Sequence, residues 1–439
     1  MDKSSLKCIR NSEDLISQLP DEILIFILSP LKMKEAIRTS VLSHRWECLW
    51  SFTDTLDFDD PDTMQEIDDR KKKLKTERKK FVKRVNRILG LNQASTINKF
   101  RVCFELGKNS TRHIDSWLDF AISKRVKRLE LDFTPLESMR HYYTFSHEQL
   151  TRIISKIGVH CINFLTSLTL KYVNVTGELL EHCLSICPVL EKLHVARCQS
   201  LGRLKISGPS LQLKYLHIIN CSQIESIDIF APNLESFGFV GPRIELYVNY
   251  APCLLDVLIG AIYLVRINYL FCPLSNYLSQ LQRLTLDICN LNDDNLELPD
   301  LQGLLNLRHL EVRIATSNDG SLLGLIPLIE ATRVLHKFSL ELTYFPCSKL
   351  RKEIELRKVM KCPNEHLKVV EIMGFVGRAI DIELAVYLLE IAVKLEKICI
   401  NPRVPHLVGT PWEAEKEGDR ESAEQLKRHL PLGAELVIL

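Results

Sequence analysis

The sequence has little net charge and no long apolar run. Over 439 residues the formal net charge is +2, which excludes one strongly basic or acidic field around the whole protein but leaves room for local charged patches. No stretch approaches the roughly 20 consecutive apolar residues of a membrane-spanning helix. The first residues, MDKSSLKCIRNSEDL, contain no apolar signal core. We therefore expect the protein in the cytoplasm, the nucleus or both, and not in a membrane.

Closely paired cysteines are also missing. There are 14 cysteines but no tight CxxC pair, and Cys183 and Cys187 stand four apart without a second pair, so the spacing of a structural zinc site is lacking. The expected compartments are reducing, which predicts free thiols. The histidines His182, His194 and His217 do not have ligand spacing either. We expect neither a metal nor another cofactor.

Motifs of catalysis are lacking as well. The sequence contains no P-loop, no G-x-G-x-x-G opening a helix, no H-E-x-x-H and no G-x-S-x-G. A thiol enzyme would need a cysteine of low pKa beside a histidine, whereas the cysteines here recur with the repeats described next and favour packing. We expect a non-catalytic protein.

Leucine at a fixed spacing is what the sequence has in abundance. The pattern L-x-x-L-x-L-x-x-C, or a close relative, begins at Leu165, Leu190, Leu213 and Leu281, and looser copies run from Ile97 to Leu395. The second and third apolar positions are two apart, as in a strand with one buried face. Small cysteines follow the strand in the clearest copies, at Cys198, Cys221 and Cys289. Stacked copies predict a parallel sheet over a continuous leucine core, which is a leucine-rich-repeat solenoid.

The length of the repeats varies along the chain. The starts at Leu190, Leu213, Leu234 and Leu254 are 23, 21 and 20 residues apart, and a second alternating run (LKI, IDI or IELYV) lies inside each of these units. Such short units have little room for an outer helix, so we expect two strands per turn there. Elsewhere we expect helices behind the sheet, as in HIDSWLDFAI, whose apolar residues recur at helical spacing.

The chain from about Cys362 onwards reads as one oversized unit. A strand (LKVVEIMGF) precedes a helix (IDIELAVYLLEIAV) and a second strand (LEKICI). A charged helical segment from Glu413 to His429 then leads into a terminal strand, AELVIL. Because the end of a solenoid is an open sheet edge, a distinct capping unit is expected there.

The stretch QLPDEILIFILSPLKMKEAIRTSVLSHRWECLW, from Gln18 to Trp50, is too short for a core of its own. It predicts three short helices: one opened by Pro20, one around residues 34–40, and one capped by Ser43. Trp46 and Trp50, four apart, are expected in the core of the third helix. An apolar ridge remains uncovered and marks a partner site; its residues are Leu19, Pro20, Ile23, Leu24, Ile27 and Leu31.

The basic run RKKKLKTERKKFVKRVNR, from Arg70 to Arg87, allows two interpretations. It could be an import signal or a nucleic-acid patch. Leu74, Phe81 and Val85 fall at helical spacing inside it, however, which favours an amphipathic helix with a solvated basic face.

The Leu-Pro-Asp-Glu-Ile-Leu opener, the RTSVLSHRWECLW close and the repeats together resemble plant F-box proteins. The segment HLKVVEIMGFVGRAIDIELAVYLLEIAVKLEKICI resembles the FBD domain at the end of many of them. The resemblance implies an α/β fold: an F-box of three helices (12–55), a linker with a basic amphipathic helix (56–96), a curved solenoid of leucine-rich repeats with a parallel sheet (97–355), and an FBD-like cap (356–439).

The resemblance also implies a function: a substrate-recognition subunit of an SCF-type (Skp–cullin–F-box) ubiquitin ligase. The F-box would bind a Skp-type adaptor and, through it, a cullin–RING ligase, while the repeats hold a protein substrate. Glu47 departs from the family, which usually carries a basic residue there. The residues that match the adaptor-facing motif are Leu19, Pro20, Ile23, Leu24, Leu28, Arg45 and Trp46.

The partner surface of the repeats is expected on the concave face, where the outward side chains of the parallel strands gather. They are polar and mixed in charge, which suits a protein or peptide. Two alternatives remain open: a repeat scaffold or inhibitor that acts without a ligase, and a nucleic-acid binder using residues 70–87. The predicted concave residues are Lys192, His194, Tyr215, His217, Arg283, Thr285, Asp287, His309, Glu311, Arg313, Lys337, Ser339 and Glu341.

Overall fold

The regularly spaced leucines form the core of a parallel sheet. Leu168, Leu193, Leu216 and Leu284 lie in four of the repeats, and each is at most 2% exposed. The structure is a computed structural model that describes residues 16–136, 142–158, 163–208, 211–261, 271–289, 303–316, 322–344, 362–403 and 420–439. The parts of the predicted F-box, repeats and cap that lie outside the described residues are 12–15, 137–141, 159–162, 209–210, 262–270, 290–302, 317–321, 345–361 and 404–419. The chain divides into unit 1 (Met1–Ser138) and unit 2 (Met139–Leu439).

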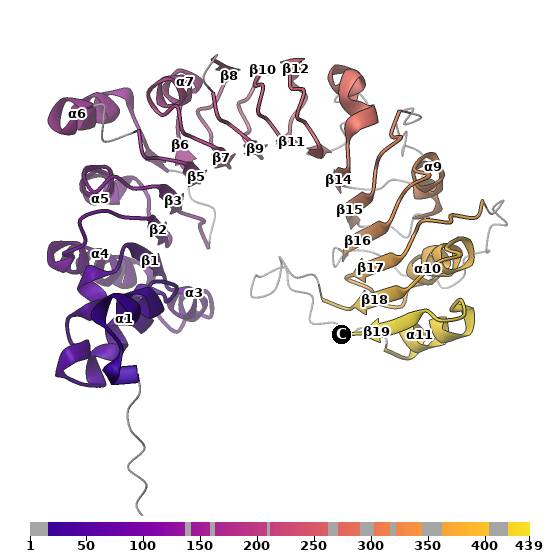
Figure 1. The fold of residues 1–439 in the computed structure, drawn as a ribbon, viewed down its shortest axis with the longest axis horizontal. Helices are drawn as coiled ribbons and strands as arrows, with labels where there is room; N and C mark the ends of the chain where they lie inside the picture. The colour runs from indigo at the N-terminus through magenta and orange to yellow at the C-terminus, as the bar shows by residue number, and fades with distance from the viewer. Residues whose placement is uncertain are drawn as a thin grey trace, which may run out of the picture. The chain divides into compact units, whose positions relative to one another are not determined.

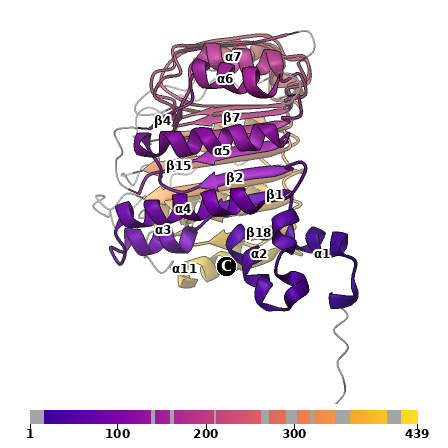
Figure 2. The same cartoon turned by 90° about the vertical axis from the view of Figure 1, so that its left-hand side faces the viewer.

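Unit 1 begins with short helices and continues into the first strands (Figure 2). Its helical turns before residue 55 are η1 (Ile16–Gln18), α1 (Asp21–Leu28), α2 (Met33–Arg38), η2 (Thr39–Val41), η3 (His44–Trp46) and η4 (Leu49–Phe52). Then follow β1 (Thr55–Asp59), α3 (Pro61–Asp68), α4 (Leu74–Leu91), β2 (Lys99–Cys103), η5 (Lys108–Ser110), α5 (Thr111–Ser123) and β3 (Arg128–Asp132).

The first two predicted helices form as expected, and the third does not. Pro20 precedes α1, where its missing N–H costs no hydrogen bond. In place of one helix after Ser43 the chain forms two separate 3-10 turns, η3 and η4. Ser43 takes the N-cap position, but its side chain accepts no capping hydrogen bond, so nothing extends the turn into a helix.

The segment 56–96 differs from the linker that was expected. Strand β1 pairs in parallel with β2, from Thr55 opposite Lys99 to Asp59 opposite Cys103. β1 therefore adds a strand before the first predicted repeat, and α3 and α4 belong to the same folded unit. The sequence does not indicate β1, because its two buried apolar residues, Leu56 and Phe58, lack the leucine that precedes the strand in the repeat pattern.

The basic run folds as the predicted amphipathic helix α4. Phe81, Val85 and Ile88 are buried on one side. Phe81 stacks on Phe104 with 4.3 Å between ring centroids. Figure 2 shows α4 and α5 side by side in front of the strands, and α5 buries the predicted apolar face, which comprises Ile114, Trp117, Leu118, Ala121 and Ile122.

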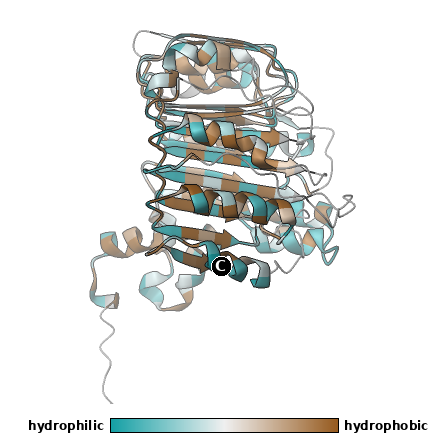
Figure 3. Cartoon of the chain, turned by 90° about the vertical axis from the view of Figure 1, so that its right-hand side faces the viewer, coloured by the Kyte–Doolittle hydropathy of each residue, from teal (hydrophilic) through white to brown (hydrophobic). Residues whose placement is uncertain are grey.

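In unit 2 parallel strands follow one another along a single sheet (Figure 1). They are β5 (Ser167–Lys171), β7 (Lys192–Ala196), β9 (Tyr215–Ile219), β11 (Ser236–Gly241), β13 (Asp256–Ala261), β14 (Arg283–Cys289), β15 (His309–Thr316), β16 (Lys337–Tyr344), β17 (Val369–Met373), β18 (Lys397–Asn401) and β19 (Glu435–Ile438), hydrogen-bonded in that order. Figure 3 shows hydrophobic and hydrophilic residues alternating along strands.

The prediction of two strands per turn in the short repeats is confirmed. β8 (Arg203–Ser207), β10 (Ser226–Phe230) and β12 (Glu245–Tyr250) form a second parallel sheet, in the order β12-β10-β8. It lies on the side of unit 2 away from the inner face of the long sheet (Figure 1). A two-stranded sheet also pairs β4 (Tyr143–Thr144) with β6 (Val173–Asn174).

Helices occupy the same outer side in the longer repeats. They are α6 (His147–Ile157), α7 (Gly177–Ile186), η7 (Cys272–Gln280), η8 (Leu322–Leu325), α9 (Ile326–Ala331), α10 (Ala379–Ile391), α11 (Arg420–Gln425) and η10 (Leu426–His429). The predicted strand–helix–strand arrangement after Cys362 is present as β17, α10 and β18. Among the described helices, none is both long and apolar enough to cross a membrane.

The turns after β7 and β9 explain two of the three recurring cysteines, whereas Cys289 is the last residue of β14 and does not follow its strand as predicted. Arg197 and Asn220 directly follow β7 and β9 and adopt left-handed backbone conformations, with φ of 57° and 55°. The next residues, Cys198 and Cys221, are at most 1% exposed. The Cys198 thiol lies 3.3 Å from both the backbone nitrogen and the carbonyl oxygen of Val175. A small side chain is required because the chain turns inward there.

Candidate functional site

Helix α1 carries apolar side chains on two faces. Leu24 and Leu28 are at most 1% exposed. Ile23, Phe26 and Ile27, which share the opposite side at i, i+3 and i+4 spacing, are 45%, 76% and 43% exposed. A helix that is apolar on both sides has one face left for a partner.

The predicted adaptor-binding residues fall into buried and exposed groups. Leu24, Leu28 and Trp46 form one core with Leu49, against which Leu19 packs. Pro20, Ile23 and Arg45 are exposed. The prediction of one continuous exposed ridge is therefore wrong, because Leu24 lies inside the core and cannot belong to an exposed surface. Trp46 is core as well, as its spacing from Trp50 predicts.

Three strongly exposed apolar residues were absent from the sequence prediction. Phe26 on α1, Val41 in η2 and Leu42 after it are 76%, 87% and 64% exposed. The sequence signal for Phe26 is the uninterrupted apolar run ILIFIL, which is longer than one buried face of a short helix requires. Val41 and Leu42 lie between polar residues, and no periodic signal singles them out.

Arg45 holds the entry of α1 in place. Its Nε and Nη2 donate hydrogen bonds of 2.9 and 2.6 Å to Oδ1 of Asp21. Nη2 also donates to the carbonyl oxygen of Leu19. Asp21 lies in the first turn of the helix, where its negative charge also stabilises the helix dipole. Arg45 thereby orders the backbone on which Leu19 and Pro20 lie.

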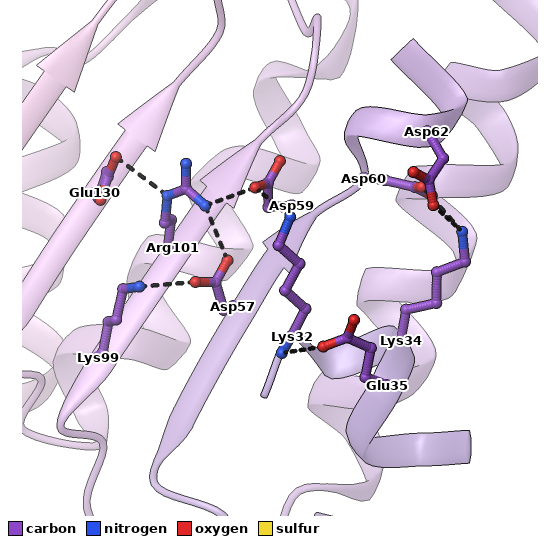
Figure 4. A network of polar contacts seen from close by, with 10 residues as sticks. All are labelled: Lys32, Lys34, Glu35, Asp57, Asp59, Asp60, Asp62, Lys99, Arg101 and Glu130. Atoms are coloured by element: carbon purple, nitrogen blue, oxygen red, sulfur yellow. Dashed lines mark hydrogen bonds and ion pairs between the residues drawn. The ribbon is translucent and has the colours of Figure 1, made fainter. Parts of the chain in front are cut away.

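An ion-pair network joins these helices to the first strands (Figure 4). Lys32, just before α2, lies 2.9 Å from Asp59 at the end of β1. Arg101 on β2 lies 2.9 Å from Asp59, 3.3 Å from Asp57 and 3.2 Å from Glu130 on β3. Burial by itself would raise the pKa of Asp59, but the hydrogen bonds from Lys32 and Arg101 hold it below its ordinary value. The network therefore remains ionised and spans three strands.

A second set of ion pairs lies behind α2. Asp60 is 3% exposed and accepts from Arg84 of α4 at 2.8 Å and from Lys34 of α2 at 3.3 Å. Burial opposes ionisation of Asp60, yet Arg84, Thr63 and Lys34 hold its pKa below the ordinary value. Together with Lys32–Asp59, these contacts attach the N-terminal helices to the first strands as one unit.

The predicted concave residues form rows across the long sheet. The strand register aligns Lys192 with Tyr215 and Arg283 with His309 and Lys337. The residues of a second row are His194, His217, Thr285, Glu311 and Ser339, and those of a third are Asp287, Arg313 and Glu341. His217, Thr285, Ser339 and Glu341 are 9% exposed or less, so they support the face more than they offer contacts.

A directional chain of hydrogen bonds crosses strands β9, β11 and β13. The Ser236 hydroxyl donates to Oδ2 of Asp256 at 3.0 Å, so Ser236 Oγ accepts from Nε2 of His217 at 3.2 Å. Nδ1 of His217 must then accept from the Tyr215 hydroxyl at 2.6 Å. Burial lowers the pKa of His217 to about 3, which keeps the ring neutral. The ring needs the space beside Gly238, where a Cβ would lie 2.7 Å from it.

Carboxylates surround Arg313 in the third row. Its guanidinium lies 2.7 Å from Glu311 and 3.7 Å from Glu341. Burial raises the pKa of Glu341 to about 7, against the attraction of Arg313. Burial likewise raises the pKa of Asp287, which Arg313 partly offsets. This part of the face therefore changes charge near neutral pH.

The buried thiols do not have the environment of a nucleophile. Burial raises the pKa of Cys183 and of Cys221 to about 12, whereas a reactive cysteine requires a lowered pKa. Among the side chains that the structure describes, no three His, Cys, Asp or Glu residues are grouped so that they could hold a metal ion.

Known protein families match both the N-terminal helices and the repeats of this chain. The family described as "At1g61320/AtMIF1, LRR domain" matches residues 91–406, and the F-box domain family matches residues 16–54. The chain belongs to the F-box/LRR proteins. In this F-box/LRR protein the F-box match covers the helices α1 to η4 and ends just before β1.

Several relatives of this F-box/LRR protein come from Arabidopsis thaliana. F-box/LRR-repeat protein At3g03360 is 31% identical over 252 residues, which are 53% of this chain and 48% of that protein, so the match spans about half of its length. F-box/LRR-repeat protein 25 is 31% identical over 54% of this chain and 86% of its own length. F-box/FBD/LRR-repeat protein At5g53840 is 26% identical over 89% of this chain and 88% of its own length.

Proposed function

We propose that this protein is the substrate-recognition subunit of an SCF-type ubiquitin ligase in the cytoplasm, the nucleus or both. Its F-box would bind a Skp-type adaptor, and through it a cullin–RING ligase, while the inner face of the repeats holds a protein substrate. The protein would have no catalytic role of its own.

The exposed face of α1 is the observation that carries this proposal. Ile23, Phe26 and Ile27 present apolar surface on a helix whose other side is already filled by Leu24 and Leu28. Exposed apolar side chains of this kind favour docking of a partner helix or groove. Arg45 and Asp21 fix the entry of that helix, so the surface is ordered before binding.

Capture of a purified Skp-type adaptor by the full chain tests the proposal. Phe26→Asp should weaken capture at least about tenfold, because a charge would be placed in the apolar contact. Phe26 is 76% exposed, so the variant should melt at the parent temperature. Leu91→Asp is the matched control, since Leu91 is also exposed, at 48%, but lies at the end of α4. Equal capture by both variants would refute the assignment.

An FBD-like cap at residues 356–439 is part of the same proposal. The names of the relatives At5g53840 and At5g22700 include FBD. In this chain α10 lies between β17 and β18, and β19 adds a parallel strand to β18. Such a unit would cover the hydrophobic end of the repeats, and the partner would bind elsewhere on the inner face.

Two other functions compete with this one. A scaffold or inhibitor would use the repeats without a ligase, and it would ignore the adaptor altogether. A nucleic-acid binder would use the basic face of α4, but Arg78 and Arg84 of that helix already pair with Glu105 and Asp60. Binding of an oligonucleotide that falls steeply with salt would favour the nucleic-acid function.

A further inference from the structure

The starts of three neighbouring strands bring together an unusual number of basic side chains. Arg283, His309 and Lys337 are aligned in the register of β14, β15 and β16. The residues just before them are also in register, because the amide of Arg308 donates to the carbonyl of Gln282 at 2.9 Å, and that of His336 to Arg308 at 2.8 Å. We call the five basic residues Arg283, Arg308, His309, His336 and Lys337 the basic rim.

The five residues of the basic rim and Gln282 occupy six aligned positions, and none of the six carries an acidic side chain. Adjacent strands lie about 4.8 Å apart, so side chains from all three strands can reach one small group. Long flexible arginine and lysine side chains extend this reach further.

Most of the basic rim is available to a ligand. Arg283, Arg308 and His309 are exposed. Among the described residues no carboxylate lies within ion-pair distance of Arg283 or Arg308, whereas Lys337 pairs with Glu371 at 2.8 Å. The guanidinium groups of Arg283 and Arg308 therefore lie on two adjacent strands without a described carboxylate at ion-pair distance, which favours an anionic group from outside.

The hydrogen bond of Arg283 prepares His309 as a donor. Nη2 of Arg283 lies 3.4 Å from Nδ1 of His309, and a guanidinium can only donate. Nδ1 therefore accepts, and a neutral ring carries its proton on Nε2. Burial lowers the pKa of His309, and its interactions with Arg283, Lys337, His336 and Arg308 lower this pKa further. The ring therefore lies in a positive local potential.

Nearby carboxylates restrict the size of the anion. Asp256 is aligned with Arg283 on the neighbouring strand β13, and Glu311 lies two residues beyond His309. Glu371 lies on the other side, next to Lys337. An extended polyanion such as RNA would meet these negative charges, whereas a single anionic group would not.

We propose that the basic rim binds one compact anionic group, a phosphate or a carboxylate, carried on an extended segment of the protein substrate. This deepens the proposed function and depends on it, because the partner is the substrate that the repeats are proposed to hold. Two guanidinium groups and the Nε2–H of His309 would donate to the anion, and charge-assisted hydrogen bonds of this kind are the strongest that proteins form.

Degenerate nonapeptide libraries with a fixed central residue test this proposal on the full chain. One library carries phosphoserine at the centre, one carries glutamate, and one carries serine. We expect the phosphoserine library to be retained at least about tenfold better than the serine library. Retention of the glutamate library to the same extent would identify a carboxylate as the anion and would also support the proposal.

The variants separate the basic rim from general charge. Arg283→Gln with Arg308→Gln should abolish the preference without lowering the melting temperature, since both residues are exposed. Lys214→Glu is the control outside the basic rim. Lys214 precedes the inner strand β9, as Arg308 precedes β15, but it pairs with Glu191 at 3.1 Å. This variant should retain the preference.

Three outcomes would overturn the proposal. They are equal retention of all libraries, a preference unchanged in the double variant, and tighter binding of a single-stranded RNA 20-mer that depends on Arg283 and Arg308. Capture of the Skp-type adaptor is measured on the same variants. A variant that loses the phosphoserine preference but still captures the adaptor reports on the basic rim alone. Failure of the parent chain to capture the adaptor would instead contradict the proposed function.

Discussion

Arg45 reaches back 24 residues to Asp21 and binds the same carboxylate oxygen with two of its nitrogens, at 2.9 and 2.6 Å. The contact ties the last turns of the F-box to the start of its first helix. Both side chains are exposed, so the contribution of the pair to the free energy of unfolding should be below about 1 kcal/mol. Its importance lies in ordering the surface next to Ile23 and Phe26.

Arg45→Ala should therefore weaken adaptor binding more than it weakens the fold. We expect an affinity several-fold lower, a melting temperature near that of the parent, and no further loss when Asp21→Asn is added, because the two residues act as a pair. Arg38→Ala, in the exposed last turn of α2, is the control for loss of a surface arginine. Titration with a purified Skp-type adaptor measures the effect, and equal affinities for the Arg45 and Arg38 variants would contradict it.

Arg84→Ala should destabilise unit 1 by about 2 to 4 kcal/mol. It leaves the carboxylate of Asp60, which is 3% exposed, with a weaker partner in Lys34, and breaking a buried pair is costly. Lys83→Ala, one residue earlier and exposed on the same helix, should be nearly silent. Thermal unfolding at neutral pH compares the two.

The ion pair between Arg84 and Asp60 also predicts that part of the stability of unit 1 is lost in acid. Because the pKa of Asp60 is lower in the folded state, its contribution to stability is present above the ordinary carboxyl pKa and is lost as pH falls. The difference between Arg84→Ala and the parent should therefore shrink in acid. A difference that stays constant down to low pH would show that Asp60 is not the partner that matters.

Gly238→Ala should cost about 1 to 3 kcal/mol, as overpacking in a buried site does. The added Cβ would lie 2.7 Å from ring atoms of His217, and the ring cannot move without breaking its bonds to Tyr215 and Ser236. His217→Ala should remove most of the additional cost in the double variant. A Cβ added to Gly202 would have no atom within 4 Å, so Gly202→Ala is the control. Melting temperatures of the four variants give the coupling.

Glu341→Gln should stabilise the protein at alkaline pH and leave it unchanged in acid. The folded pKa of Glu341 is about 7, raised from 4.5 by burial. Between these values the folded state binds more protons than the unfolded state, so the free energy of unfolding falls as pH rises and then levels off above the folded pKa. Removing the carboxyl should add about 1 to 2 kcal/mol at pH 8. A melting temperature equal to the parent's at pH 8 would contradict the raised pKa, and Glu435→Gln on the exposed edge strand is the control.

The repeats could be predicted from the sequence because one rule, alternation around spaced leucines, determines both the strands and their register. The second sheet was predicted from the short length of three repeats together with the second alternating run inside each of them. β1 was missed since Leu56 and Phe58 lack the preceding leucine of the pattern, and the third F-box helix was expected from spacing although the chain forms two turns.

The candidate surfaces were predictable only in part. Periodicity identifies an apolar face but does not decide which of two apolar faces is buried, so Leu24 was assigned to the ridge and Phe26 was overlooked. On the inner face, alternation correctly identifies Arg283, His309 and Lys337 as aligned positions. It does not identify Arg308 and His336, because residues before the strand take their direction from the turn.

The outer sheet of β8, β10 and β12 has a consequence for how the repeats bend. Neighbouring strands lie about 4.8 Å apart, while packed helices need about 8 to 10 Å. Repeats with an outer helix are therefore wider on the outer side than on the inner side, whereas repeats with a strand on each side are equally wide on both. Within unit 2 the bend must be taken up on either side of β7 to β12 and not within it. The basic rim on β14 to β16 lies among the repeats that are wider on the outer side. There the inner side chains of neighbouring repeats converge and can close around one small group.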